Sequence, residues 1–127
     1  MPATSNYAAL LALLFVLLSV RTIGARRRLK IPIGDAGDES MLRAMRVHSN
    51  FAEYVPLGLL LIYFVEISGA RAWLVHSLGI CLVAGRLSHA FGVSQARETY
   101  GFRVTGMALT LTTILVPAGY LIYCLVK

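Results

Sequence analysis

Acidic residues, cysteines and histidines are all scarce in this sequence. It has 6 Asp and Glu against 12 Lys and Arg, and charged residues make up only 14% of its 127 positions, whereas soluble domains carry roughly 25%. Hydrophobic residues make up 57%, and the mean hydropathy is +0.72. A chain this short could not bury so much apolar surface in a core of its own. The composition therefore excludes an ordinary soluble domain and indicates a membrane protein.

The few potential metal ligands exclude further classes of protein. Cys81 and Cys124 lie inside apolar runs, without the spacing of a metal site or a redox pair, and we expect both to be buried as small apolar side chains. The 3 histidines have no ligand spacing, so no metal is expected. The net charge of +6 does not indicate nucleic-acid binding, because the basic residues flank apolar runs and no nucleic-acid motif is present.

The apolar segments predict the fold. Each of the four is close to the roughly 20 residues that a membrane-spanning helix needs, and no alternating strand pattern occurs. Helices also satisfy their own backbone hydrogen bonds in lipid. We therefore expect an all-α integral membrane protein, a four-transmembrane-helix antiparallel bundle in a single domain, 1–127, with helices over about 4–27, 40–67, 72–92 and 102–126.

The borders of the first two helices carry more detail. The first apolar run, 7–20, has no charge before it and no clean cleavage site after it, so we expect a retained helix rather than a signal peptide. The stretch IPIGDAGDES then predicts a loop, in which Asp38 or Ser40 can cap the second helix.

The basic residues predict an orientation in the membrane. Nearly all of them border the loops after the first and third helices, whereas the opposite side has only Arg71 and Lys127. Loops rich in Lys and Arg stay on the cytoplasmic side. We therefore expect loops 1 and 3 to be cytoplasmic and both termini to lie outside.

A polar stripe runs along the start of the second helix. Spacings of three and four residues place its members on one helix face; they are Arg43, Arg46, Asn50 and Glu53, with Tyr54 beside them. His48 points roughly 200° away from Arg46 at 100° per residue. It is therefore poorly placed for the pocket of its own subunit but could serve that of a neighbour.

Other polar side chains fall at the same membrane surface. Arg86 and His89 share a face of the third helix, Arg103 opens the fourth, and Arg26 ends the first. Intramembrane ionisable groups are costly and indicate a functional site by default. Guanidinium groups bind carboxylates bidentately, and an arginine beside a thiol lowers the pKa of that thiol. The alternative is a structural ion pair that ties the helices together.

Two further ionisable residues lie elsewhere. His76 is in the middle of the third helix, where we expect a helix-packing hydrogen bond. Glu66 is near the opposite membrane surface, where we expect it to be solvated.

The stretch RVHSNFAEYVP resembles the signature of the MAPEG family, the membrane-associated proteins in eicosanoid and glutathione metabolism. The segments GARRR, GRLSHAFG and FRVTGM are similar to the corresponding parts of that family, in the same order along nearly the whole chain. The resemblance implies a homotrimer of four-helix subunits, with glutathione bound between subunits at the cytoplasmic side. Bacterial members often carry SHAFG, so a bacterial inner-membrane protein is expected.

The resemblance also implies roles for individual residues. Glutathione would be bound by Arg46, Asn50, Glu53 and Tyr54, with Arg86 and His89 on the third helix and with Arg26 and His48 reaching in from an adjacent subunit. Arg103 is similar to the arginine that stabilises the glutathione thiolate, with Arg97 or Tyr100 as alternatives. Some members have tyrosines at the positions of His89 and Val93, and this chain departs from that synthase-type pattern.

These observations predict a membrane-bound glutathione-dependent transferase or peroxidase acting on hydrophobic electrophiles that arrive from the lipid. The first alternative is a non-catalytic MAPEG-fold protein that binds a lipid or a small molecule. The second is a small multidrug-type transporter, which would need a glutamate well inside the first helix, where this chain has no acidic residue.

Overall fold

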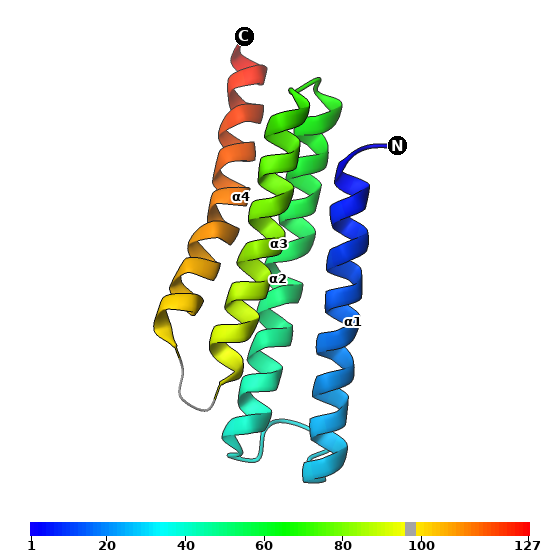
Figure 1. The fold of residues 1–127 in the computed structure, drawn as a ribbon, viewed down its shortest axis with the longest axis vertical. Coiled ribbons are helices and arrows are strands. Elements are labelled where there is room, and N and C mark those ends of the chain that lie inside the picture. Colours follow the sequence, from blue (N-terminus) through cyan, green and yellow to red (C-terminus); the bar gives the residue numbers. More distant parts are fainter. Residues whose placement is uncertain (96–98) are drawn as a thin grey trace.

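The computed structural model describes residues 1–95 and 99–127, and this part of the chain forms four helices: α1 (Thr4–Leu29), α2 (Glu39–Ile67), α3 (Ala72–Ser94) and α4 (Tyr100–Val126). They run up and down as an antiparallel bundle (Figure 1). Each is long and apolar enough to cross a membrane, so the predicted fold class is confirmed. The observed bounds differ from the expected ones by about two residues, mainly because α1 and α3 continue further and α4 begins earlier.

Local chemistry explains where α1 ends and α2 begins. Lys30 adopts a left-handed conformation, with φ of 55°, and closes α1. Of the two predicted caps, Asp38 is the one used: its carboxylate accepts hydrogen bonds from the Met41 backbone N–H at 2.9 Å and from the Ser40 hydroxyl at 2.6 Å. These hydrogen bonds, led by the one from Ser40, lower the pKa of Asp38 from its ordinary value.

Glycines allow α3 and α4 to pack backbone against backbone. A Cβ added to Gly106 would lie 2.5 Å from the His89 backbone nitrogen and 2.7 Å from the Gly85 carbonyl oxygen. A Cβ added to Gly92 would lie 2.8 Å from the Arg103 backbone nitrogen. Because neither helix can back away from a side chain there, these glycines fix the distance between the helix turns that carry His89 and Arg103.

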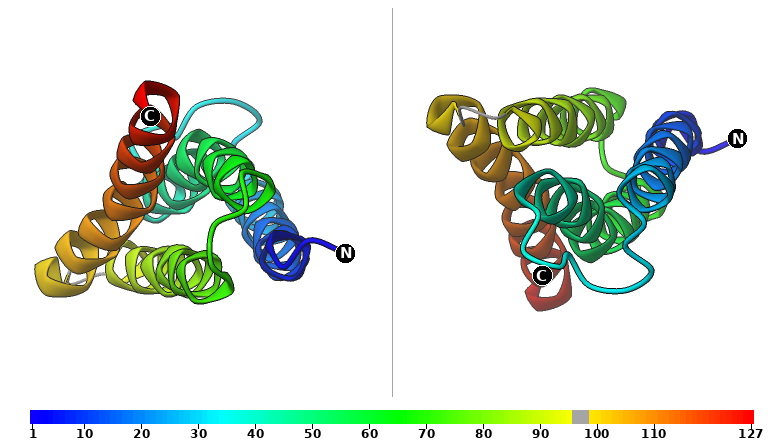
Figure 2. Two further views of the ribbon diagram at one scale, coloured as in Figure 1. Left: turned by 90° about the horizontal axis from the view of Figure 1, so that it is seen from above. Right: turned by 90° about the horizontal axis from the view of Figure 1, so that it is seen from below.

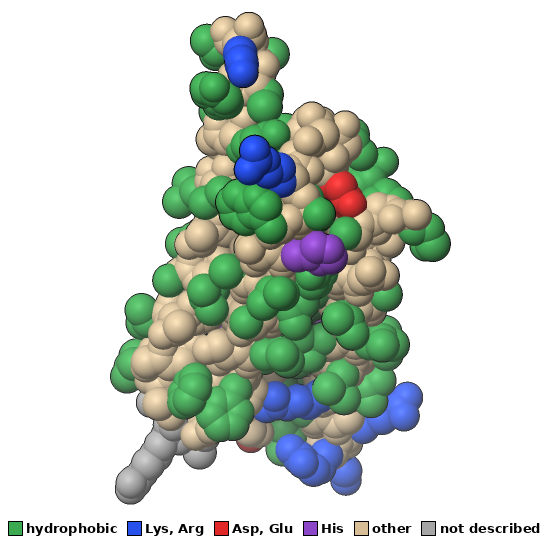
Figure 3. Space-filling view, turned by 45° about the horizontal axis from the view of Figure 1, so that its top comes forward, with side chains coloured by type: hydrophobic (Ala, Val, Ile, Leu, Met, Phe, Trp, Pro, Cys, Tyr) green, Lys and Arg blue, Asp and Glu red, His purple; other side chains and the backbone are tan. Residues whose placement is uncertain are grey.

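The apolar core lies between α1, α2 and α3. Its buried members include Leu11, Leu18, Val47, Phe51, Val55, Ile62, Leu78 and Leu82. Helices α1 and α4 lie at opposite corners of the bundle (Figure 2). Large apolar side chains also cover the outer surface (Figure 3); Leu13 and Leu115, for example, are 70% and 71% exposed. An apolar exterior of this kind suits lipid rather than water.

Polar contacts join the helices at the end of the bundle where α1 begins. The Glu66 carboxylate accepts hydrogen bonds from the backbone N–H groups of Ala3 and Thr4 and, at 2.6 Å, from the Thr4 hydroxyl. Glu66, which was expected to be solvated, is partly exposed, and in addition it caps the free N–H groups of α1. The expected packing hydrogen bond of His76 is confirmed, since its Nδ1 lies 2.8 Å from the Tyr7 hydroxyl.

The prediction that both cysteines are buried was wrong. Cys124 is exposed near the end of α4, and Cys81 is only partly buried. The outer faces of these helices meet lipid, and a small apolar side chain can face lipid without being buried inside the protein.

Candidate functional site

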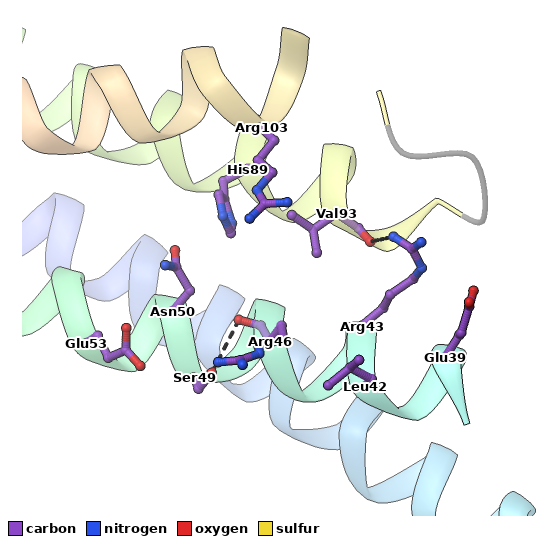
Figure 4. Close-up of a pocket in the computed structure, with 10 residues that line it drawn as sticks. All are labelled: Glu39, Leu42, Arg43, Arg46, Ser49, Asn50, Glu53, His89, Val93 and Arg103. Carbon is purple, nitrogen blue, oxygen red and sulfur yellow. Dashed lines mark hydrogen bonds between the residues drawn. The ribbon is translucent and has the colours of Figure 1, made fainter. Parts of the chain in front are cut away.

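A cavity of about 590 Å³ opens at the end of the bundle where α1 ends and α2 begins. It lies between α2 on one side and α3 with α4 on the other (Figure 4). Its lining is rich in charged and polar side chains and consists of Glu39, Leu42, Arg43, Arg46, Ser49, Asn50, Glu53, His89, Val93 and Arg103. A cavity of this size falls in the range of roughly 300–1,000 Å³ that small-molecule sites occupy.

Helix α2 supplies most of the lining. The predicted polar stripe of Arg43, Arg46, Asn50 and Glu53 does share one face, and that face looks into the cavity. The reason is their spacing, because these residues recur every three or four positions over about three turns of helix. The chain thus places one continuous wall of guanidinium, amide and carboxylate groups along the cavity.

The opposite wall comes from α3 and α4. His89 and Arg103 lie next to each other and face α2 across the cavity, with Val93 further along α3 (Figure 4). The glycine contacts described above bring these two helices together at this level. At the mouth, Nη1 of Arg43 donates a hydrogen bond to the Val93 carbonyl oxygen at 3.4 Å and so links the two walls.

Arg86 lies behind the cavity and does not line it. Its side chain is only 1% exposed, Nη2 donates to Asn50 Oδ1 at 2.7 Å, and Nη1 donates to the Thr110 hydroxyl at 3.2 Å. Its Nε has no hydrogen-bond partner among the described residues, and its guanidinium carbon is 5.9 Å from the centroid of the Phe51 ring. Arg86 therefore ties α2, α3 and α4 together directly beneath the cavity.

This contact decides what Asn50 offers to a ligand. Arginine is a donor only, so Asn50 must turn its carbonyl oxygen toward Arg86. The amide NH₂ group remains, and no described residue accepts a hydrogen bond from it. Asn50 thus adds a hydrogen-bond donor to the guanidinium groups of the cavity.

The charges of the cavity are of both signs and are separated. Arg43, Arg46 and Arg103 contribute cations, whereas Glu39 and Glu53 contribute carboxylates. Within the described chain, Glu53 forms no hydrogen bond or ion pair with another residue, and neither does the Arg46 guanidinium. Charged groups without partners are suited to binding a ligand that carries the opposite charges.

Several predicted site residues lie outside the cavity. His48 points away from it, as the helical geometry predicted: its Nε2 is 3.0 Å from the Ser19 hydroxyl, and its ring stacks on Phe15. Arg26 donates hydrogen bonds to the carbonyl oxygens of Ile31 and Gly34 in its own loop. Tyr54 is partly buried and does not line the cavity.

Of the alternatives to Arg103, Tyr100 begins α4, is 68% exposed and does not line the cavity. Arg97 lies outside the described residues. Among the candidates that the structure describes, Arg103 is thus the one at the cavity.

The sequence reasoning missed part of the lining. Leu42 and Ser49 were not singled out, although they lie four residues before and three residues after Arg46, so the helical period could have found them. Glu39 was not predicted as a site residue either, yet it lies at the mouth of the cavity. Val93 also lines the cavity, but its side chain is apolar and offered no reason to expect it in a polar site.

A match to a protein family decides the classification. The MAPEG family profile matches residues 4–123. The chain belongs to the MAPEG family. Two relatives are each called "Inner membrane protein YecN", from Escherichia coli strain K12 and from Escherichia coli O6:H1 strain CFT073. Each is 37% identical to this chain over 109 residues, which is 86% of this chain and 82% of the relative.

Proposed function

We propose that this MAPEG protein is a membrane-bound glutathione-dependent transferase or peroxidase that acts on hydrophobic electrophiles. It would work in a bacterial inner membrane as a homotrimer, with the cavity at the cytoplasmic side. The observation that supports the proposal best is the 590 Å³ cavity, where the Arg46 guanidinium and the Glu53 carboxylate face the space and pair with no described residue.

The chemistry of glutathione is complementary to this lining. The tripeptide has two carboxylates, one ammonium and one thiol. Arg43, Arg46 and the amide of Asn50 are donors for carboxylates. Glu53 is a free acceptor for the ammonium, and Arg103 is a cation that favours the thiolate over the thiol.

Other residues would act around this core of the site. His89 would contribute to the wall beside Arg103, and Arg86 would act through Asn50 by fixing its amide. Tyr54 borders the polar stripe. Arg26 and His48 are held by their own α1 and loop, and the proposal assigns them to the border with the neighbouring subunit.

The reaction would begin with loss of the thiol proton to water, with Arg103 stabilising the resulting thiolate. In the transferase reaction the thiolate attacks an electrophilic carbon, a carbon–sulfur bond forms, and the leaving group departs with its electron pair. In the peroxidase reaction the sulfur attacks the peroxide oxygen and releases an alcohol. A second glutathione then gives the disulfide and water, so that two thiols reduce one peroxide.

The test uses purified protein in detergent, mixed with glutathione, with the ultraviolet absorbance of the thiolate as the signal. We expect the signal to rise in the parent and to be lost in Arg103→Ala, while calorimetry shows that both proteins bind glutathione. An Arg103→Ala variant with undiminished turnover and thiolate signal would overturn the role of Arg103.

A non-catalytic ligand-binding protein is the second candidate. It is favoured by His89 and Val93, which form the cavity wall at positions where some family members have tyrosines. It predicts no thiolate signal in the parent. If calorimetry also detects no binding of glutathione, the glutathione proposal is wrong.

A further inference from the structure

A second concavity lies at the end of α1, away from the cavity between α2, α3 and α4. It measures about 390 Å³ and is lined by Arg26, Arg27, Lys30, Ile31 and Pro32. None of these residues lines the larger cavity. The lining combines three cations with an apolar floor. The glutathione proposal uses Arg26 at the border with the neighbouring subunit, but it gives no role to Arg27, Lys30 or the apolar floor.

The wall of this groove is held in place by the fold. Ile31 is 8% exposed and packs with Ala25, Met41 and Ala44. Nη1 of Arg26 donates hydrogen bonds to the carbonyl oxygens of Ile31 and Gly34, at 3.4 and 2.9 Å. The loop therefore folds back against the end of α1, and Ile31 and Pro32 form a fixed apolar surface beside the basic side chains.

The two outer cations have no internal partner. The side chains of Arg27 and Lys30 are exposed, and no described residue forms a hydrogen bond or an ion pair with either. The nearby acidic residues serve the loop itself, because Asp35 accepts from the Gly37 N–H and Asp38 caps α2. The groove thus presents uncompensated positive charge.

The level of the groove along α1 points to the lipid headgroups. Helix α1 has 26 residues, which at about 1.5 Å per residue is roughly 39 Å long. The hydrocarbon core of a bilayer is about 30 Å thick, so roughly six residues of α1 must extend beyond it. The apolar run occupies the N-terminal part, and the residues beyond the hydrocarbon are therefore those at its basic end. Figure 3 shows the corresponding gathering of Lys and Arg side chains below the apolar surface.

We propose that this groove binds the headgroup of an anionic glycerophospholipid. The phosphate would lie between Arg27 and Lys30, and the glycerol with the first methylene groups would cover Ile31 and Pro32. An amphiphile uses both the charge and the apolar floor of the groove, whereas a free phosphate ion gains nothing from the floor. The proposal is that one lipid molecule binds at this site. It differs from the non-specific electrostatic attraction of basic loops to an anionic membrane surface.

Native mass spectrometry of the full chain in detergent, titrated with phosphatidylglycerol or phosphatidylcholine, tests the proposal. The variant is the exposed pair Arg27→Gln/Lys30→Gln. The matched control is Arg71→Gln/Lys127→Gln, which removes the same charge from the other end of the bundle. We expect the parent to prefer phosphatidylglycerol and the groove variant to bind it at least tenfold more weakly, since each basic residue near an anionic surface contributes about fivefold. The control pair should bind like the parent.

Two outcomes would overturn the proposal. Equal weakening in both double variants would mean that only net charge matters. Displacement of phosphatidylglycerol by millimolar inorganic phosphate would mean that the groove takes a soluble anion. Calorimetry with glutathione separates this site from the larger cavity, because the groove variant should bind glutathione as the parent does even if lipid binding is lost.

Discussion

Two glutamates of α2, Glu66 and Glu53, have carboxylates in opposite environments. Glu66, at the end where α1 begins, accepts hydrogen bonds from Ala3 and Thr4, and Tyr7 and His76 pair beside it. Glu53, midway along α2, lines the cavity that opens at the other end and pairs with no described residue. Where the protein supplies the partners of a charged group, that group holds helices together; where it does not, a ligand can supply them.

The same contrast applies to the arginines of the cavity end. Arg86 is buried and donates hydrogen bonds to Asn50 and Thr110, whereas Arg46 is exposed to the cavity and its guanidinium pairs with no residue in 1–95 or 99–127. A helical wheel would not distinguish these two arginines, because it shows the face on which a residue lies and not its partners on other helices. A buried and bonded arginine such as Arg86 shapes the cavity, whereas an exposed arginine such as Arg46 would contact a ligand inside it.

The largest effect is expected from separating the walls of the cavity. Gly106→Leu places a side chain against the backbone of α3 at His89 and Gly85, so α3 and α4 cannot pack, and we expect a loss of roughly 3 kcal/mol or more in the free energy of unfolding. Gly119→Leu is the matched control in the same helix, because nothing lies within 4 Å of its added Cβ. Thermal unfolding in detergent measures both, and equal stabilities would contradict this account of the α3–α4 contact.

The comparison of the two glutamates can be tested directly with Glu66→Gln and Glu53→Gln. We expect Glu66→Gln to lower the free energy of unfolding by about 1–2 kcal/mol, because charged hydrogen bonds to α1 are lost, and to leave glutathione binding unchanged. Glu53→Gln should weaken glutathione binding about tenfold without changing stability. Calorimetry and thermal unfolding give the two readouts, and the reverse pattern would mean that the roles are exchanged.

Asn50→Asp sharpens the contrast within the cavity end. The new carboxylate would pair with the buried Arg86, so we expect unchanged or higher stability. It would also replace the amide donor with a negative charge, and glutathione should bind roughly tenfold more weakly. If Asn50→Asp binds glutathione as well as the parent, the amide is not a donor to the ligand.

The smallest effect is expected at the Asp38 cap, which belongs neither to the Glu66 contacts nor to the lining of the cavity. Because folding lowers the pKa of this carboxyl from its ordinary value of 3.8, its contribution to stability is present at neutral pH and is lost as the pH falls through the lowered pKa. Asp38→Asn keeps a good N-cap that does not titrate. The parent should therefore lose slightly more stability than the variant between pH 5 and pH 3 in thermal unfolding, and identical pH profiles would contradict the assignment.

Sequence patterns alone determined the four spanning helices, the Asp38 cap and the shared face of Arg43, Arg46, Asn50 and Glu53. These features depend on hydropathy, capping chemistry and helical period, which act between residues close together in the chain. The direction of His48 followed from the same period.

Tertiary structure decided which polar groups have partners. Glu66 meets Thr4 across 62 positions of sequence, and Arg86 meets Asn50 across 36. No periodicity within one helix records such contacts, because they depend on how far the helices slide and rotate against one another. For α3 and α4 that packing is set by backbone contact at Gly85, Gly92 and Gly106, and it is what turned a polar stripe predicted on one helix into one wall of a cavity.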